Sequence, residues 1–261
     1  MTATATASPR LIAVASGKGG VGKTWLSITL AHSFARKGER VLLFDGDLGL
    51  ANVDVQLGLD PKHDVTAVFA GRLTLTEAVP PDVLAGRSGS GALAALTKTQ
   101  LDAMTRALRL VSGHYDRTIV DLGAGIDPIV LTLVNASDTA LVILNDEPTS
   151  LTDAYALIKV ASRARADHDW RIAVNTVPTH EEGRKVFASL SKACRGFLGF
   201  EPALAGVVRR DSRVRDAIRA QTPFLTRSLA SPAAEDVAAL AIALARPRAA
   251  TGRADGLKAL K

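Results

Sequence analysis

The string GKGGVGKT at residues 17–24 holds the residue types that a phosphate-binding site needs. It matches the pattern G-x-x-x-x-G-K-[ST], with Lys23 and Thr24 in the last two places. An apolar run at 11–15 predicts a buried strand before the string, and residues 25–36 predict a helix after it. A glycine loop between a strand and a helix is the context in which this pattern binds nucleotide phosphates. We therefore expect a nucleotide site here rather than a glycine-rich surface turn.

Each part of the string has its own task in such a site. Glycines let backbone N–H groups approach phosphate oxygens closely, and the start of the following helix adds partial positive charge. Lys23 is expected to reach the β- and γ-phosphates of ATP, and the Thr24 hydroxyl to ligate Mg²⁺. The residues expected along the nucleotide are Gly17, Lys18, Gly19, Gly20, Val21, Gly22, Lys23, Thr24 and Trp25.

Three aspartates follow predicted strands of the same sheet. Asp45 and Asp47 come after the buried run at 41–44, and Asp121 follows the β-branched residues at 118–120. Ligands of open α/β sheets bind beyond the carboxyl ends of the strands, so these acids should face the phosphate loop. Asp121 then has the position of a carboxylate that holds the Mg²⁺ hydration shell. The alternative is that the three acids only cap solvated turns.

Lys18 is a second lysine in the loop, five residues before Lys23. A simple phosphate loop needs one lysine, and Lys18 stands away from the helix, so it cannot reach the same phosphates from the same direction. One physical use for it is to contact a nucleotide bound by a second copy of the protein, as a trans-acting cation. The alternative is a solvated loop charge.

The elements that must position these residues alternate between strand and helix along the chain. Residues 98–114 predict an amphipathic helix, and Ser150 with Asp153, like Thr179 with Glu182, has the spacing of a capping box. This alternation predicts one doubly wound α/β domain whose mostly parallel sheet is covered by helices on both faces. Further strands are expected at the start of the segment DVLAGRSGSGALAAL (82–96) and at 115–121, 139–145, 170–177 and 203–208. Further helices are expected from about 211 and at 231–245.

Composition and charge narrow the class of protein. The 261 residues are 47% hydrophobic, which is typical of a globular chain. Cys194 is the only cysteine, and no apolar run approaches a membrane span, so we expect a cytoplasmic protein without disulfides. The net charge of +6 permits contact with nucleic acid or an anionic membrane without demanding either. We expect a disordered leader at 1–9, an ATPase domain at 10–246 and a basic flexible tail at 247–261.

Several motifs together resemble one known family. KGGVGKT at 18–24 resembles the deviant Walker A motif of the MinD/ParA family of P-loop ATPases. The segments DGDLGLANVDVQLGL at 45–59, VDLGAGI at 120–126 and DEPTSLTDAYALIK at 146–159 are similar to the FlhG/FleN branch, which regulates flagellar number. The resemblance runs, with interruptions, from about residue 11 to about residue 245.

The resemblance implies further roles for individual residues. Lys18 would be the signature lysine that touches the partner's nucleotide in an ATP-bound sandwich dimer, and Asp47 would polarise the attacking water. Asp45 and Asp121 would organise Mg²⁺, and Asn175 would contact the adenine edge. The segment 123–126 would sense the γ-phosphate. The implied cofactors are ATP and Mg²⁺, and the implied partners are a second copy of the chain and an FlhF-like GTPase or a flagellar basal-body or regulator protein.

The chain departs from the family pattern at three places. Trp25 stands where a small or polar residue is usual, and we expect it to pack under the loop. Arg209, Arg210 and Asp211 replace a common proline, which leaves the second adenine contact open. The leader lacks the glutamine-containing motif by which FlhG proteins activate FlhF, so that role is not implied.

The sequence therefore predicts a Mg-dependent ATPase that switches between monomer and ATP-bound dimer and regulates flagella. Two alternatives remain open. A ParA-like partition or cargo-positioning ATPase would bind non-specific DNA, for which the arginines at 209, 210, 213, 215 and 219 are the candidates. A MinD-like division-site regulator would contact the inner membrane through the tail, where Leu257 and Leu260 lie among lysines.

Overall fold

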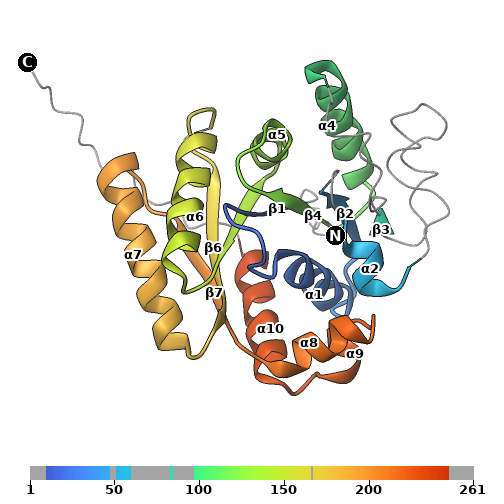
Figure 1. Cartoon of the computed structure of the whole chain (residues 1–261). Helices are drawn as coiled ribbons and strands as arrows, with labels where there is room; N and C mark the ends of the chain where they lie inside the picture. Colours follow the sequence, from blue (N-terminus) through green and yellow to red (C-terminus); the bar gives the residue numbers. More distant parts are fainter. Residues whose placement is uncertain (1–9, 48–50, 60–82, 85–96, 166, 247–261) are drawn as a thin grey trace, which may run out of the picture.

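A seven-stranded sheet, parallel throughout, forms the centre of the computed structural model (Figure 1). The structure describes residues 10–47, 51–59, 83–84, 97–165 and 167–246, so the predicted leader and tail lie outside it. The strand order is β3-β2-β4-β1-β5-β6-β7, which places β1 in the middle. The strands are β1 (Arg10–Ser16), β2 (Val41–Gly46), β3 (Val83–Leu84), β4 (Arg117–Ala124), β5 (Thr139–Leu144), β6 (Asp169–Val177) and β7 (Ala203–Arg209).

Helices cover both faces of the sheet, as the alternation predicted. One hydrophobic core joins the sheet to α4 (Lys98–Ser112), α5 (Pro128–Ala136), α6 (Pro148–Ala161) and α7 (His180–Leu198). The other core joins it to α1 (Lys23–Ala35), α2 (Val53–Leu57), α8 (Ser212–Arg219), α9 (Phe224–Arg227) and α10 (Pro232–Ala245). None of the helices in the described part of the chain is long and apolar enough to cross a membrane.

The strand β1 shows why its sequence reads as a continuous apolar run. Leu11 and Ala13 face the first core, Ile12 and Val14 face the second, and all four are buried. Both faces of a parallel sheet are covered by helices, which explains why residues 11–15 of this central strand are all apolar. The same strand then delivers the glycine loop to the carboxyl edge of the sheet.

Two details differ from the sequence-based expectations. The helix α6 begins at Pro148, a residue type that is common in the first turn of a helix. The predicted capping box at Ser150 and Asp153 is therefore wrong, because Ser150 already lies inside the helix. Its hydroxyl accepts a hydrogen bond from the backbone N–H of Asn145 at 3.1 Å. Asp121 does not end its strand, because β4 is paired on both sides and continues to Ala124. The cap at Thr179 is confirmed, with its hydroxyl accepting from the N–H of Glu182 at 3.2 Å.

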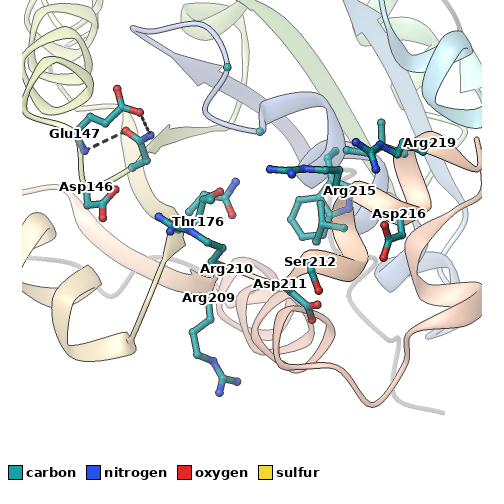
Figure 2. Close-up of a pocket in the computed structure, with 17 residues that line it drawn as sticks. Asp146, Glu147, Thr176, Arg209, Arg210, Asp211, Ser212, Arg215, Asp216 and Arg219 are labelled. Carbon is teal, nitrogen blue, oxygen red and sulfur yellow. Dashed lines mark hydrogen bonds between the residues drawn. The ribbon is translucent and has the colours of Figure 1, made fainter.

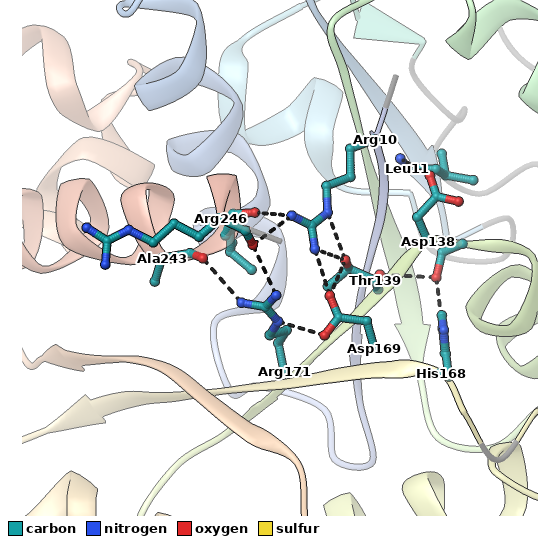
Figure 3. A network of polar contacts seen from close by, with 11 residues as sticks. Arg10, Leu11, Asp138, Thr139, His168, Asp169, Arg171, Ala243 and Arg246 are labelled. Atoms are coloured by element: carbon teal, nitrogen blue, oxygen red, sulfur yellow. Dashed lines mark hydrogen bonds and ion pairs between the residues drawn. The ribbon is translucent and has the colours of Figure 1, made fainter. Parts of the chain in front are cut away.

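A polar cluster at the amino-terminal ends of the strands ties the last helix to the sheet (Figure 3). Arg10 and Arg171 both pair with Asp169, at 2.7 and 2.8 Å. Arg10 also donates to the carbonyl of Leu244, and Arg171 to that of Ala243, so the two guanidinium groups satisfy carbonyls at the end of α10. This cluster is structural, because it lies at the edge of the sheet opposite the glycine loop.

Candidate nucleotide-binding site

The glycine loop folds as a cradle between β1 and α1. Gly20 and Gly22 have φ angles of 79° and 83°, a left-handed conformation that glycine adopts without strain. Gly22 caps α1 with no side-chain hydrogen bond to the first turn, which leaves the backbone N–H groups of that turn available to an anion. Lys23 and Thr24 form the first residues of the helix. The local geometry is therefore that of a phosphate site.

Close packing also requires glycine at two positions of the loop, Gly17 and Gly22. A Cβ atom on Gly17 would stand 2.1 Å from the carbonyl oxygen of Asp153 in α6, so only glycine fits. A Cβ on Gly22 would stand 2.5 Å from Nδ2 of Asn175. That Nδ2 donates to the carbonyl oxygen of Val21 at 2.8 Å, so the asparagine at the end of β6 holds the loop directly.

Two buried carboxylates lie beside the loop. Asp45 and Asp121 are register partners on β2 and β4, and both are almost completely buried. Burial and, after it, the neighbouring Asp121 carboxylate raise the pKa of Asp45 to about 7, even though three backbone N–H donors act to lower it. Burial likewise raises the pKa of Asp121, while the Lys23 ammonium and then the hydroxyls of Thr24 and Ser27 lower it.

The chemistry of this donor set suits a hard divalent cation. Asp45, Asp121 and Thr24 offer carboxylate and hydroxyl oxygens, which are the ligands that Mg²⁺ takes together with water and nucleotide phosphates. Two adjacent buried carboxylates repel each other, and a cation beside them would relieve that repulsion.

Asp47 is half-buried and its carboxylate lies against Gly123, with Oδ1 3.5 Å from where a Cβ of that glycine would stand. Asp47 therefore lies beside the segment 123–126, which was predicted to sense the γ-phosphate.

Lys18 points at its own chain. Its ammonium group pairs with the carboxylate of Glu147 and donates to the hydroxyl of Thr149 at 2.8 Å. Glu147 caps the start of α6, and Asn145 donates to its other oxygen at 2.8 Å. The Lys18 contact holds the pKa of Glu147 below its usual range. The second loop lysine is therefore neither a free surface charge nor directed to its own phosphate cradle.

A cavity of about 760 Å³ opens beside the loop (Figure 2). Asp146 and Glu147 stand on one side of it, and Arg215 and Arg219 from α8 on the other, with Thr176 and Arg210 between them. Trp25 is buried, lines the cavity and meets the ring of Phe224 edge-on at a centroid distance of 5.3 Å. The loop and β6 contribute Gly20, Gly22 and Asn175 to the lining.

The arginines expected to form one basic patch have different environments. Arg209 pairs with Asp236 at 2.8 Å and with Glu235 at 3.4 Å, which raises its pKa. Arg213 pairs with Asp211 at 3.8 Å. The remaining three, Arg210, Arg215 and Arg219, make no ion pair within the described residues, and all three line the cavity rather than a separate surface.

Comparison with known proteins agrees with this geometry. Residues 12–224 match the CbiA family, the CobQ/CobB/MinD/ParA nucleotide binding domain. The chain belongs to this family. It is 41% identical to the antiactivator FleN of Pseudomonas aeruginosa, over 81% of this chain and 78% of FleN. It is 33% identical to the flagellum site-determining protein YlxH of Helicobacter pylori, over 80% of this chain and 73% of YlxH.

Solved structures of MinD/ParA proteins share the fold. The cell division ATPase MinD of Pyrococcus furiosus has a TM-score of 0.73 at 23% identity, covering 91% of this chain and 98% of MinD. MinD of Pyrococcus horikoshii, solved with Mg-ADP, has a TM-score of 0.72 at 23% identity, covering 89% and 94% of the two chains. The predicted doubly wound fold and the predicted family are therefore both confirmed.

The structure brings the predicted site residues of this MinD/ParA-family chain to one edge of the sheet. The loop 17–24, the three aspartates and Asn175 all lie there. Asn175 was predicted to contact the adenine edge, and in the structure its amide N–H donates to the carbonyl of Val21 in the loop. Sequence reasoning missed Glu147 and Thr149 as partners of Lys18, and Ser27, which donates to Asp121 at 2.8 Å. Ser27 stands one helical turn after Lys23, and that spacing is the one signal that could have found it.

Proposed function

We propose that this protein is a Mg-dependent ATPase that alternates between a monomer and an ATP-bound dimer and thereby regulates the number or placement of flagella. The observation that carries the proposal is the position of Lys18. It lies in the phosphate loop, but its ammonium group pairs with Glu147 and bonds to Thr149 of its own chain. The Lys18 ammonium group lies at the edge of the site, where it could stabilise the phosphates of a nucleotide bound by a second copy of the chain.

The residues of this chain would divide the work of phosphoryl transfer. The loop amides and Lys23 would hold the phosphates, and Asp47 would orient the attacking water. Mg²⁺, held through Thr24, Asp45 and Asp121, would supply charge that offsets the developing negative charge on the phosphoryl oxygens. Lys18 of a second copy would complete the site, and a trans-acting cation of this kind contributes roughly 10³–10⁵ in rate.

Asn175, Arg210 and Asp211 line the cavity where the base and ribose would lie. We propose that Asn175 contacts the adenine edge while it holds the carbonyl of Val21, since an amide group offers two N–H donors and an acceptor. Trp25 would form part of the cavity wall on the α1 side.

The flagellar assignment rests on relatives. FleN is named an antiactivator and YlxH is named flagellum site-determining, and the identity of 41% to FleN extends over most of both chains. For this assignment, the gene should restore normal flagellar number to Pseudomonas aeruginosa lacking FleN. Failure at normal expression would contradict the flagellar role and leave the ATPase proposal standing.

The biochemical core of the proposal has its own test. Steady-state Mg-ATP hydrolysis per molecule should rise with protein concentration, and sedimentation velocity should show a dimer with a slowly hydrolysed ATP analogue and a monomer with ADP. A rate per molecule that is constant over a wide concentration range would contradict a dimer-dependent site.

The two alternative functions give different outcomes in binding assays. A partition-type ATPase would bind DNA only with ATP, and the affinity would fall steeply with added salt. Two of the five candidate arginines are engaged with acids and the other three face the cavity, which leaves little of a separate DNA surface. A membrane-associated regulator would co-sediment with anionic liposomes in ATP, and removal of residues 253–261 would abolish this binding.

A further inference from the structure

The helix α2 is only five residues long and begins at Val53, eight residues after Asp45, which lies near the carboxyl end of β2. A single helical turn is unstable on its own, because the cost of nucleation is not repaid by its few hydrogen bonds. Val53 is fully buried and Leu57 packs against the same core, while Val55 is 49% exposed. Polar contacts at the two ends of α2 add to this apolar packing.

At its first end, α2 is bonded to a carboxylate of the site. The backbone N–H groups of Asn52 and Val53 donate to Oδ2 of Asp45 at 3.0 and 3.1 Å. These are among the N–H groups that have no partner within a helix. A shift of α2 would therefore move or release the Asp45 side chain.

At its other end, α2 rests on the turn that follows α8. Nε2 of Gln221 donates to the carbonyl oxygen of Val55 at 2.8 Å, a contact between residues 166 positions apart. Gly58 ends α2 with a φ of 62°, and a Cβ there would stand 3.2 Å from the Cβ of Gln221. Gln221 itself has a φ of 48°, the left-handed conformation that residues other than glycine rarely adopt. Two residues with left-handed backbone conformations thus pack against each other, and at Gln221 this conformation is energetically less favourable than it is at a glycine.

The helix that precedes Gln221 forms a wall of the cavity. Arg215, Asp216 and Arg219 of α8 line the cavity on the side opposite Glu147 (Figure 2). On the proposed function, the base and ribose would lie in this cavity. The same helix ends at Arg219, two residues before Gln221. A continuous set of contacts therefore joins the cavity wall to α2 and, through α2, to Asp45.

We propose that Gln221 is a positioning residue that couples the base end of the nucleotide site to the Asp45 carboxylate through α2, an inference that rests on the proposed nucleotide site. A nucleotide that contacts α8 fixes the turn at Gln221, and Gln221 then fixes α2 and the carboxylate bonded to it. The consequence is that the base helps to set the geometry of the acids at the phosphate end.

Hydrogen exchange of the full chain, with and without Mg-ADP, tests the coupling without requiring hydrolysis. In the wild type, Mg-ADP should slow exchange in two separate segments, 17–24 and 51–58. In Gln221→Ala and in Gln221→Glu, which keeps the shape but removes the donor, the slowing in 17–24 should remain. The slowing in 51–58 should shrink by about fivefold, as expected for the net loss of one hydrogen bond.

A matched control separates coupling from damage to the turn. Thr222→Ala alters the next residue, whose hydroxyl bonds locally to the carbonyl of Ala220, and should leave both segments as in the wild type. Gln221 is exposed, Thr222 is partly buried, and each variant removes only one hydrogen bond, so the melting temperature should fall by no more than about 4 °C in all three. In hydrolysis assays, the Gln221 variants should lower kcat with little change in KM, because α2 acts on the acids rather than on nucleotide affinity.

The outcomes distinguish the inference from its premise. Wild-type slowing in 51–58 that persists in both Gln221 variants, or that is lost equally in Thr222→Ala, would overturn the coupling and leave the nucleotide site intact. Absence of slowing in 17–24 in the wild type would contradict the nucleotide site itself, and with it the coupling.

Discussion

The ammonium group of Lys18 and the carboxylate of Glu147 form an ion pair between the phosphate loop and the start of α6. The pair lies at the rim of the nucleotide cavity, and Thr149 and Asn145 support it from the same chain. Any role of Lys18 in a second subunit requires this pair to open. If Lys18 acts in a second subunit as proposed, the pair opposes association of the isolated chain.

Glu147→Gln should shift the monomer–dimer equilibrium toward the dimer, because it removes the charge that retains Lys18. The protein concentration that gives half-maximal ATP hydrolysis per molecule should fall. Both side chains are partly exposed, so the free energy of unfolding should change by less than about 1 kcal/mol. Glu181→Gln, which breaks the exposed pair with Lys185, is the matched control and should leave the concentration dependence unchanged. An unaltered concentration dependence in Glu147→Gln would show that the pair does not restrain Lys18.

Gly17→Ala should destabilise the protein even without nucleotide, because the new Cβ would overlap the Asp153 backbone in α6. We expect a loss of at least about 1–3 kcal/mol in the free energy of unfolding, measured by urea denaturation. Gly19→Ala is the control within the same loop, since a Cβ there meets nothing within 4 Å and should change stability by less than about 0.5 kcal/mol. Equal stability of the two variants would mean that the loop does not pack on α6 as described.

Asp45 should make the nucleotide-free protein less stable as the pH rises. Its pKa is raised to about 7 in the fold, so between about pH 4 and about pH 7 the unfolded chain releases a proton that the folded chain retains. Stability from this group is complete below that window and is lost through it. Asp121 acts in the same direction, while the lowered pKa values of Asp169 and Asp236 act in the opposite one.

A difference measurement isolates the Asp45 contribution. The melting temperature of the wild type minus that of Asp45→Asn, without Mg²⁺ or nucleotide, should fall as the pH is raised through this window. A difference that stays constant, or that grows with pH, would contradict the protonated, buried state of Asp45.

The sequence predicts those parts of this fold whose signals are local. The apolar run before Gly17, the loop and the helix after it are contiguous, and each buried strand has its own apolar run. The predicted start of α6 is wrong because Ser150 is a residue type that often caps helices, whereas the helix begins two residues earlier, at Pro148.

Contacts between distant residues carry no such local signal. The pairing of Lys18 with Glu147 joins positions 129 residues apart, and Asn175 reaches Val21 across 154 residues. Gln221 is not a residue type that indicates a left-handed conformation, so its contact with α2 required the structure. The phosphate site was thus predictable from the sequence, whereas the interactions that restrain it were not.

Mixing two inactive variants tests the trans-acting lysine most directly. Lys18→Ala lacks the lysine but keeps Asp47, and Asp47→Ala lacks the acid but keeps Lys18, so each homodimer should hydrolyse ATP very slowly. In a mixed dimer, the site that retains Asp47 receives Lys18 from the other subunit and is complete. An equimolar mixture should therefore recover about one quarter of the wild-type rate, because half of the dimers are mixed and each has one complete site. A mixture as inactive as its two components would contradict the account.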